Sequence, residues 1–368
     1  LSSVSDIGEN ITMSFETVHL QAIILASKFK RANVCGPQSR ISLFSCNSWC
    51  ALIVHFAASL VGGIVGNHNV HLSVSEFTYQ LKLFDPELVI VGAGDRLEET
   101  CNAALERSLI EQNNGSTIFL RAPWSIEALF AMSINLGTNP GCTLDAVVDQ
   151  KNHPYMLYFT SGTSGKPKGV VLNQTAISSH AVCTICEMRL NSHDIWLHVA
   201  PIFHLVDAFS VYAVTAVGGH HILQAVFEAS TTLRVIEREG ITVLNLASTM
   251  VALMCSQTTA ENVHLDLSSL RMLSCGGSPV VNNVVLQAIG LLCSEFFVSY
   301  GMTECCGKIC VSVLDSTARQ NPNYQPNDHI SAICTSGRPF RIQKVRIVEP
   351  NGKLVVPGNG RVGEVQCK

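Results

Sequence analysis

The sequence predicts an α/β fold with mostly parallel sheets, and three observations support this. Helical and strand patterns alternate through the first third of the chain. The alternation restarts after a polar stretch, residues 137–154. From residue 338 onward, short strand patterns separated by turn residues replace it. Repeated strand–helix units build parallel sheets because each helix returns the chain to the same edge of the sheet.

In the first third, apolar spacing predicts helices over residues 15–30, 50–65 and 76–84. Strands are expected at 40–44, where apolar residues alternate, and at 87–91, a continuous apolar run of the kind buried in parallel sheets. The run over 50–65 has only 16 residues and contains a histidine and two glycines. About 20 apolar residues are needed to cross a bilayer, so we expect a buried helix and no transmembrane span.

The remaining elements follow the same logic. Beyond the polar stretch, a helix is expected at 231–239, between strands at 155–160, 196–200, 243–247, 270–274 and 295–299. Two further strands, 344–348 and 362–366, are joined by the turn Glu349–Gly352 and predict a small all-β unit.

Composition excludes several classes of protein. A net charge of −4 and a pI near 6.4 leave no excess of Lys and Arg to neutralise a phosphate backbone, so no nucleic-acid partner is expected. The hydrophobic fraction of 47% is typical of a globular chain and argues against disorder. Fifteen cysteines, an odd number in a long chain, favour an intracellular, reducing compartment, either cytoplasmic or organellar. The Cys183-x-x-Cys186 pair has no second ligand pair at a matching distance, so zinc is not expected there.

The most informative segment is glycine-rich and lies between two apolar strand patterns. Its ten residues hold four hydroxyls, three glycines and two lysines, in the order Thr160, Ser161, Gly162, Thr163, Ser164, Gly165, Lys166, Pro167, Lys168 and Gly169. Glycines let backbone N–H groups approach phosphate oxygens, hydroxyls donate hydrogen bonds and lysines neutralise charge. A Walker loop requires Gly-x4-Gly-Lys-Ser/Thr, but Pro167 stands where its second glycine would be. A flexible linker would lack the flanking strands.

This segment resembles the phosphate-binding signature of the adenylate-forming (AMP-binding) superfamily, which includes acyl-CoA synthetases, coumarate-CoA ligases, luciferases and the adenylation domains of peptide synthetases. The resemblance implies that Thr160 to Lys166 and Lys168 bind ATP, and that Lys168 is also catalytic. Three further motifs follow in the family's order. Pro201–His204 is similar to the acyl-pocket motif, which implies that His204 lies between carboxylate and nucleotide and is catalytic.

The other two motifs imply nucleotide contacts. Cys275–Pro279 is similar to the turn that borders adenine, through Gly276, Gly277, Ser278 and Pro279. Ser299–Glu304 is similar to the motif that binds the nucleotide through Tyr300, Gly301, Met302 and Thr303. In this motif the resemblance places the Tyr300 ring on adenine, the Thr303 hydroxyl on the α-phosphate and the Glu304 carboxylate on Mg²⁺, with Thr303 and Glu304 catalytic. Ser336–Pro339 and Gly363–Val365 resemble later landmarks, where a β-barrel subdomain begins and continues.

The resemblance implies a large N-terminal adenylation domain over residues 1–368, with two mostly parallel α/β parts, 1–150 and 151–335, and a partial β-barrel at 336–368. It also implies a small lysine-bearing C-terminal domain that these residues do not contain. Since the chain starts at Leu1 and stops within a strand pattern, we expect a fragment that is poorly active alone.

The implied reaction is ATP-dependent activation of a carboxylic acid to an acyl-adenylate, with release of pyrophosphate, and transfer of the acyl group to coenzyme A. Leu205 stands where amino-acid-selecting members carry an aspartate, and Asp207 lies two residues on, so an uncharged acyl or aryl acid is favoured. Three alternatives remain: a loading module that acylates a carrier-protein pantetheine, a non-catalytic nucleotide-binding relative, and a P-loop NTPase.

Overall fold

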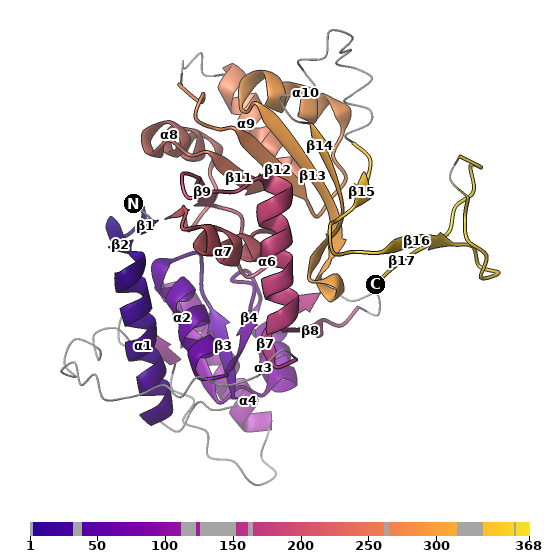
Figure 1. The fold of residues 1–368 in the computed structure, drawn as a ribbon. Helices are drawn as coiled ribbons and strands as arrows, with labels where there is room; N and C mark the ends of the chain where they lie inside the picture. The colour runs from indigo at the N-terminus through magenta and orange to yellow at the C-terminus, as the bar shows by residue number, and fades with distance from the viewer. Residues whose placement is uncertain are drawn as a thin grey trace. The chain divides into compact units, whose positions relative to one another are not determined.

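The computed structural model describes residues 3–31, 39–111, 123–125, 152–160, 165–260, 265–314, 334–356 and 358–368, and it has the predicted α/β fold (Figure 1). The chain divides into two compact units. Unit 1 comprises residues 1–178, 201–211 and 220–226, and unit 2 comprises residues 179–200, 212–219 and 227–368. Each unit is thus built from several separate stretches of the chain. The predicted domain boundaries at residues 150 and 335 stay a prediction.

Unit 1 contains a six-stranded sheet. In spatial order its strands are β6 (Pro123–Ser125), β5 (Leu88–Val91), β3 (Arg40–Phe44), β4 (Ile64–Asn67), β7 (Pro154–Thr160) and β8 (Lys168–Asn173). All neighbours are parallel except β7 and β8. We predicted the strand at 155–160 in a second α/β part, but it pairs with β4, since parallel neighbours can be far apart in sequence.

Four helices of unit 1 are α1 (Phe15–Arg31), α2 (Trp49–Leu60), α3 (Val74–Phe84) and α4 (Asp95–Glu111). The expected helix over 50–65 was too long, because α2 ends at Leu60 and Gly62 turns the chain with a φ of 69° into β4. Most of α2 is buried, as predicted. Within the ranges that the structure describes, no helix is long and apolar enough to cross a bilayer.

Unit 1 also contains a three-stranded ladder that the sequence analysis missed in part. Strand β1 (Ser3–Asp6) is antiparallel to β2 (Ile11–Ser14) and parallel to β10 (His220–Leu223). The two N-terminal strands are short and polar, with no apolar run to indicate them. Helices α6 (Gln174–Met188) and α7 (Leu205–Val217) contribute residues to both units.

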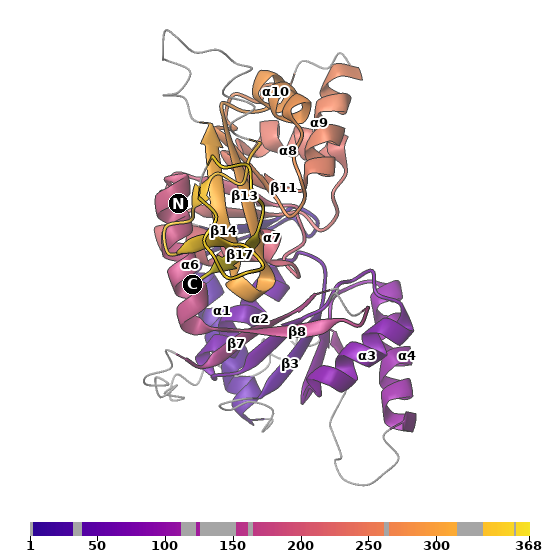
Figure 2. The same cartoon turned by 90° about the vertical axis from the view of Figure 1, so that its right-hand side faces the viewer.

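Unit 2 contains a second mostly parallel sheet (Figure 2). Its strands, in spatial order, are β15 (Arg338–Pro339), β14 (Gly307–Leu314), β13 (Glu295–Met302), β12 (Met272–Gly276), β11 (Val243–Leu246) and β9 (Ile195–His198). The four strands from β13 to β9 are parallel, and β14 and β15 are antiparallel to their neighbours. Its other helices are α8 (Ala229–Glu239), α9 (Ser248–Ala260) and α10 (Asn282–Leu291).

A separate two-stranded sheet ends unit 2 and confirms the all-β character expected after residue 338. It consists of β16 (Val345–Val348) and β17 (Glu364–Cys367), which are antiparallel. We expected the turn Glu349–Gly352 to join these two strands directly, but it does not. It returns the chain to an isolated bridge between Val348 and Leu354, and a longer connection then leads to β17.

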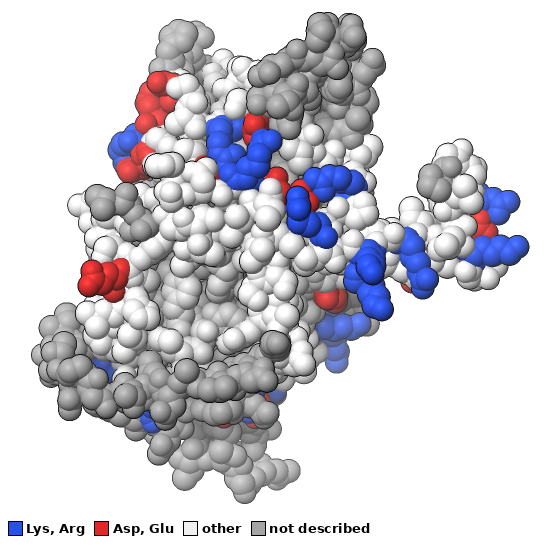
Figure 3. All heavy atoms as spheres, viewed as in Figure 1, with Lys and Arg blue, Asp and Glu red and all other residues white. Residues whose placement is uncertain are grey.

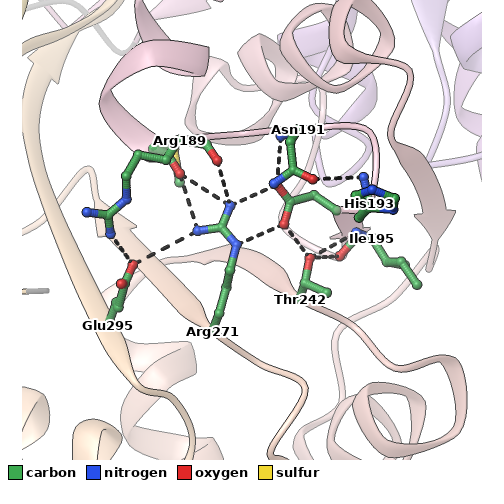
Figure 4. A network of polar contacts seen from close by, with 9 residues as sticks. Arg189, Asn191, His193, Ile195, Thr242, Arg271 and Glu295 are labelled. Carbon is green, nitrogen blue, oxygen red and sulfur yellow. Dashed lines mark hydrogen bonds and ion pairs between the residues drawn. The ribbon is translucent and has the colours of Figure 1, made fainter. Parts of the chain in front are cut away.

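A polar network joins the amino ends of the parallel strands in unit 2 (Figure 4). The Arg271 guanidinium, just before β12, donates two hydrogen bonds of 2.8 Å to the Asp194 carboxylate, just before β9. Thr242, just before β11, donates to the same carboxylate at 2.8 Å. Burial opposes ionisation of Asp194 and by itself would raise its pKa. The opposing effects are larger and lower the pKa below 3.8: they are these hydrogen bonds, a further bond donated by the Asn191 N–H, and the positive charge of Arg271. This network therefore ties three strands together at one end of the sheet.

We expect Arg271→Met to lower the free energy of unfolding of unit 2 by about 2 kcal/mol at pH 7, because it leaves the buried Asp194 carboxylate without its cation. The loss is measured by urea denaturation. Arg238→Met, which removes an exposed pair with the adjacent Glu239, is the matched control and should change stability by less than about 0.5 kcal/mol.

The depressed pKa also fixes the sign of the pH dependence. The Asp194 contribution is fully present above about pH 4 and is lost as the pH falls through its folded-state pKa. Arg271→Met should reduce this acid dependence. Equal stability of wild type and Arg271→Met at pH 7 would show that the network contributes nothing.

Candidate active site

The glycine-rich segment is the connection of the β7–β8 hairpin. Thr160, the last residue of β7, pairs with Lys168, the first residue of β8. Gly165 has a φ of 79°, a conformation that favours glycine. Lys166 and Lys168 are exposed, and no ion-pair partner is found for either among the residues described. Ser161, Gly162, Thr163 and Ser164 lie outside the described residues. The described part thus presents two lysine ammonium groups at the carboxyl end of β7, which is next to the edge strand β8.

A contact from α3 supports this hairpin connection. The Tyr79 hydroxyl donates a hydrogen bond of 3.3 Å to the carbonyl of Pro167, which lies between the two lysines. Sequence reasoning missed Tyr79, because an aromatic residue in a helical pattern gives no sign of a distant polar contact. We regard Tyr79 as a positioning residue for the lysines.

The Pro201–His204 turn is held in unit 1 by a second missed residue. The buried Asn47 side chain, just beyond β3, accepts a hydrogen bond of 2.9 Å from the Ile202 N–H. Phe203 packs into a core cluster that includes Phe44 and Phe77, whose rings stack at 4.3 Å. A polar Ser-Cys-Asn run directly after a buried strand was the available signal for Asn47.

His204 follows this anchored turn and precedes α7. Its side chain is exposed, but surrounding protein atoms desolvate the imidazole and lower its pKa below 6.5. The ring is therefore neutral at pH 7 and can donate one hydrogen bond. Because β3 and β7 are both parallel to β4, the turn after β3 and the lysine-bearing connection lie at the same edge of the sheet.

In unit 2, the register brings two predicted motifs together. Gly276 at the end of β12 is paired with Ser299 of β13, so the exposed residues Gly277, Ser278 and Pro279 lie beside Tyr300. A Cβ on Gly276 would lie 2.3 Å from the Ser299 hydroxyl oxygen. Close approach of the neighbouring strand therefore requires a glycine at this position, whatever its part in the resemblance to the adenine-bordering turn. The exposed Ser278 hydroxyl is 2.7 Å from that of Ser248 on α9.

The Tyr300–Glu304 segment begins with a β-bulge inside β13. The pairing of β13 with β14 shifts between Tyr300 and Gly301, and a Cβ on Gly301 would lie 1.8 Å from the carbonyl oxygen of Gly307. Bulges of this kind redirect side chains at the ends of strands. Tyr300 is 41% exposed and Met302 47% exposed. Thr303–Cys305 then forms a short 3-10 turn, η1, in which Thr303 is half-buried and Glu304 exposed.

The donor set around Glu304 suits a magnesium ion that arrives with its own ligands. Among the described residues, no group of three or more His, Cys, Asp or Glu side chains could hold a metal. Cys183 and Cys186 are among these residues and belong to no such group. Mg²⁺ is commonly bound by one or two carboxylates and by substrate phosphates, with water completing its shell. One exposed carboxylate on the short turn η1 fits that pattern, whereas a resident structural metal would need more ligands.

The site residues that the structure describes thus form two sets, each at the carboxyl edge of a parallel sheet. Unit 1 holds Thr160, Gly165, Lys166, Lys168 and His204, and unit 2 holds Gly276, Gly277, Ser278, Pro279, Tyr300, Gly301, Met302, Thr303 and Glu304. Ligands of open α/β sheets bind at this edge.

Comparison with known proteins identifies the family. The family model described as "AMP-binding enzyme" matches residues 2–368. The chain belongs to the AMP-binding enzymes. It is 26% identical over 301 residues to a chloroplastic/peroxisomal 2-succinylbenzoate–CoA ligase of Arabidopsis thaliana, covering 76% of this chain and 50% of that enzyme. It is 29% identical over 258 residues to a feruloyl-CoA synthase of an Amycolatopsis species, covering 67% of this chain and 49% of that enzyme.

This AMP-binding chain therefore spans about half the length of the curated relatives it matches. Its fold is similar to that of the N-terminal domain of FACL13 from Mycobacterium tuberculosis, with a TM-score of 0.78, 17% identity and coverage of 96% of this chain and 82% of that one. It is also similar to o-succinylbenzoate CoA synthetase from Bacillus subtilis, solved with ATP and magnesium, with a TM-score of 0.75, 20% identity and coverage of 100% and 67%.

Proposed function

We propose that this AMP-binding chain activates a carboxylic acid with ATP, forms an acyl-adenylate and pyrophosphate, and takes part in transfer of the acyl group to coenzyme A. The observation that carries the proposal is the placement of all four motifs at the carboxyl edges of two parallel sheets. The names of the relatives, 2-succinylbenzoate–CoA ligase and feruloyl-CoA synthase among them, support a CoA ligase.

In this proposal the two lysines act on the phosphates. Lys166 and Lys168 neutralise phosphate oxygens, and Thr160 with Ser161–Gly165 contributes hydroxyl and backbone N–H donors. Phosphoryl chemistry is catalysed mainly by positioning and charge stabilisation, so a fixed lysine is more useful than a mobile one. Lys168 meets this requirement because its backbone belongs to β8.

The unit 2 motifs bind the rest of the nucleotide in the same proposal. Tyr300 and the Gly276–Pro279 turn take the adenine, Thr303 donates to the α-phosphate, and Glu304 holds Mg²⁺. When bound, Mg²⁺ neutralises charge on the phosphates. His204, neutral at pH 7, donates to the carboxylate or to a phosphate oxygen without adding a permanent charge.

The acid substrate is proposed to lack an α-ammonium group. Leu205 follows His204 and is buried, so no carboxylate stands at that position. Asp207 is fully buried and accepts a hydrogen bond of 3.1 Å from the Ser210 hydroxyl within α7. A substrate ammonium would need a buried carboxylate for pairing. The acids in the names of the relatives, such as 4-hydroxybutyrate and indoleacetate, also lack that group.

The test is carboxylate-dependent exchange of labelled pyrophosphate into ATP by the protein that carries this chain. A panel of aryl acids, fatty acids of several lengths and α-amino acids is compared at equal concentration. We expect exchange with at least one uncharged acid and little with any amino acid. Exchange restricted to amino acids would overturn the substrate class, and ATP binding with no exchange would favour the non-catalytic alternative. Release of free phosphate without an acid would favour a P-loop NTPase.

We propose coenzyme A as the acceptor because the end of unit 2 is basic. Residues 334–368 carry seven Lys and Arg and only two Asp and Glu, whereas the whole chain has a net charge of −4. These basic side chains gather over β15 to β17 (Figure 3). Such a surface suits the phosphates of coenzyme A, which pantetheine lacks. A carrier-protein acceptor would be indicated if coenzyme A and pantetheine were used equally poorly.

A further inference from the structure

Two cysteines meet beside the turn that carries Glu304. Cys305 is the last residue of η1, and Cys367 is the last residue of β17, 62 positions later in the chain. Their sulfur atoms are 2.9 Å apart. Both side chains are half-buried, so small molecules in solvent can reach them. The contact lies within unit 2 and joins two segments with no backbone pairing between them.

We propose that Cys305 and Cys367 form a reversible disulfide that fastens the Glu304-bearing turn to β17. The oxidant is a small-molecule disulfide such as oxidised glutathione. The thiolate of one cysteine attacks one sulfur of that disulfide and releases one thiol, forming a mixed disulfide. The thiolate of the other cysteine then attacks the protein sulfur of the mixed disulfide and releases the second thiol. The two cysteines lose two protons and two electrons, and the small disulfide is reduced to two thiols.

The geometry supports both steps. The two sulfur atoms are 2.9 Å apart, so a mixed disulfide formed at one cysteine lies within reach of the other thiol.

The neighbouring cysteines provide matched comparisons. Cys306 directly follows Cys305, but it has a φ of 58° and its side chain is buried. Cys310 on β14 is a second candidate partner of Cys367, because burial raises the pKa of its thiol and the charge of Cys367 raises it further. Cys186 on α6 is exposed and belongs to the Cys183-x-x-Cys186 motif that the proposed function does not use.

The effect of the disulfide follows from where Glu304 lies. A covalent link at Cys305 restricts motion of the three-residue turn Thr303–Cys305, and this restriction is independent of any reaction. Its consequence for ATP rests on the proposed function, in which Glu304 holds Mg²⁺. The restriction of the turn and its consequence for ATP can be measured separately.

The test equilibrates the chain in glutathione buffers of decreasing reducing power and maps disulfides by mass spectrometry after alkylation. We expect a Cys305–Cys367 cross-link that is lost on addition of dithiothreitol, absent in Cys305→Ser and Cys367→Ser, and retained in Cys306→Ser and Cys186→Ser. Amide hydrogen exchange over residues 303–306 should slow in the oxidised chain and stay unchanged in Cys305→Ser under the same buffer.

Failure to form this cross-link even in fully oxidised glutathione, or a Cys310–Cys367 link in its place, overturns the proposal. So does a Cys305–Cys367 link that leaves hydrogen exchange over 303–306 unchanged. Pyrophosphate exchange by the reduced wild type tests the proposed function alone. Its absence, with the cross-link and slowed exchange present, would leave the disulfide site intact and reject the ligase.

Discussion

Replacing Glu304 with glutamine in the protein that carries this chain is expected to lower the rate of carboxylate-dependent pyrophosphate exchange by about 10²-fold or more. Glutamine keeps the size of the side chain but removes the charge that pairs with Mg²⁺. The fold should tolerate the change, because Glu304 is exposed on η1. The Mg²⁺ concentration needed for half-maximal exchange should also rise, which a purely structural role for Glu304 would not cause.

Glu99→Gln is the matched control for Glu304→Gln, because Glu99 is an exposed carboxylate on α4 in unit 1. It should exchange pyrophosphate at the wild-type rate with the wild-type Mg²⁺ requirement. An unchanged exchange rate in Glu304→Gln would remove this residue from the metal site. A lowered rate with an unchanged Mg²⁺ requirement would place it in another role.

Lys168→Ala is expected to lower pyrophosphate exchange by a similar factor of about 10². The Lys168 ammonium is exposed, and no ion pair with it is found in the described part of the chain. Its charge is thus available to a phosphate group. Its backbone is fixed by pairing with Thr160 at the start of β8, and this pairing does not depend on the side chain. We therefore expect normal thermal stability together with lost exchange and weakened ATP binding, measured by calorimetry.

Lys30→Ala on α1 serves as the comparison for Lys168→Ala, since it removes one positive charge at a position outside the four motifs. If Lys30→Ala and Lys168→Ala lowered ATP affinity equally, net charge alone would account for the loss. Wild-type exchange by Lys168→Ala would contradict the assignment of the hairpin connection to phosphate.

Much of the fold was predictable because the elements are periodic. Strands at 40–44 and 87–91 were continuous or alternating apolar runs, and the structure places β3 and β5 there. Errors arose where the local pattern was ambiguous. The apolar run over 50–65 contains both a helix and a strand, and period alone does not separate them. The strands β1 and β2 escaped because they are short and polar.

The sequence predicted the kind of site and the residues of its motifs, but it did not predict the residues that support those motifs. The lysines, His204 and Glu304 were found because their motifs are contiguous in sequence, so a single strand end or turn presents each of them. Asn47 and Tyr79 were missed because each acts through one hydrogen bond to a residue more than 80 positions away. No local pattern records such a partner.

The sequence by itself determined the fold class, the family resemblance and the chemical character of each motif, because these depend on residue types at short spacing. Only the tertiary structure decided that β7 pairs with β4, that Gly276 and Gly301 are required by neighbouring backbone, and that Cys305 meets Cys367. The physical reason is that strand pairing and thiol contacts join residues across long loops. Such contacts are selected by the packing of the whole unit, which local propensity does not specify.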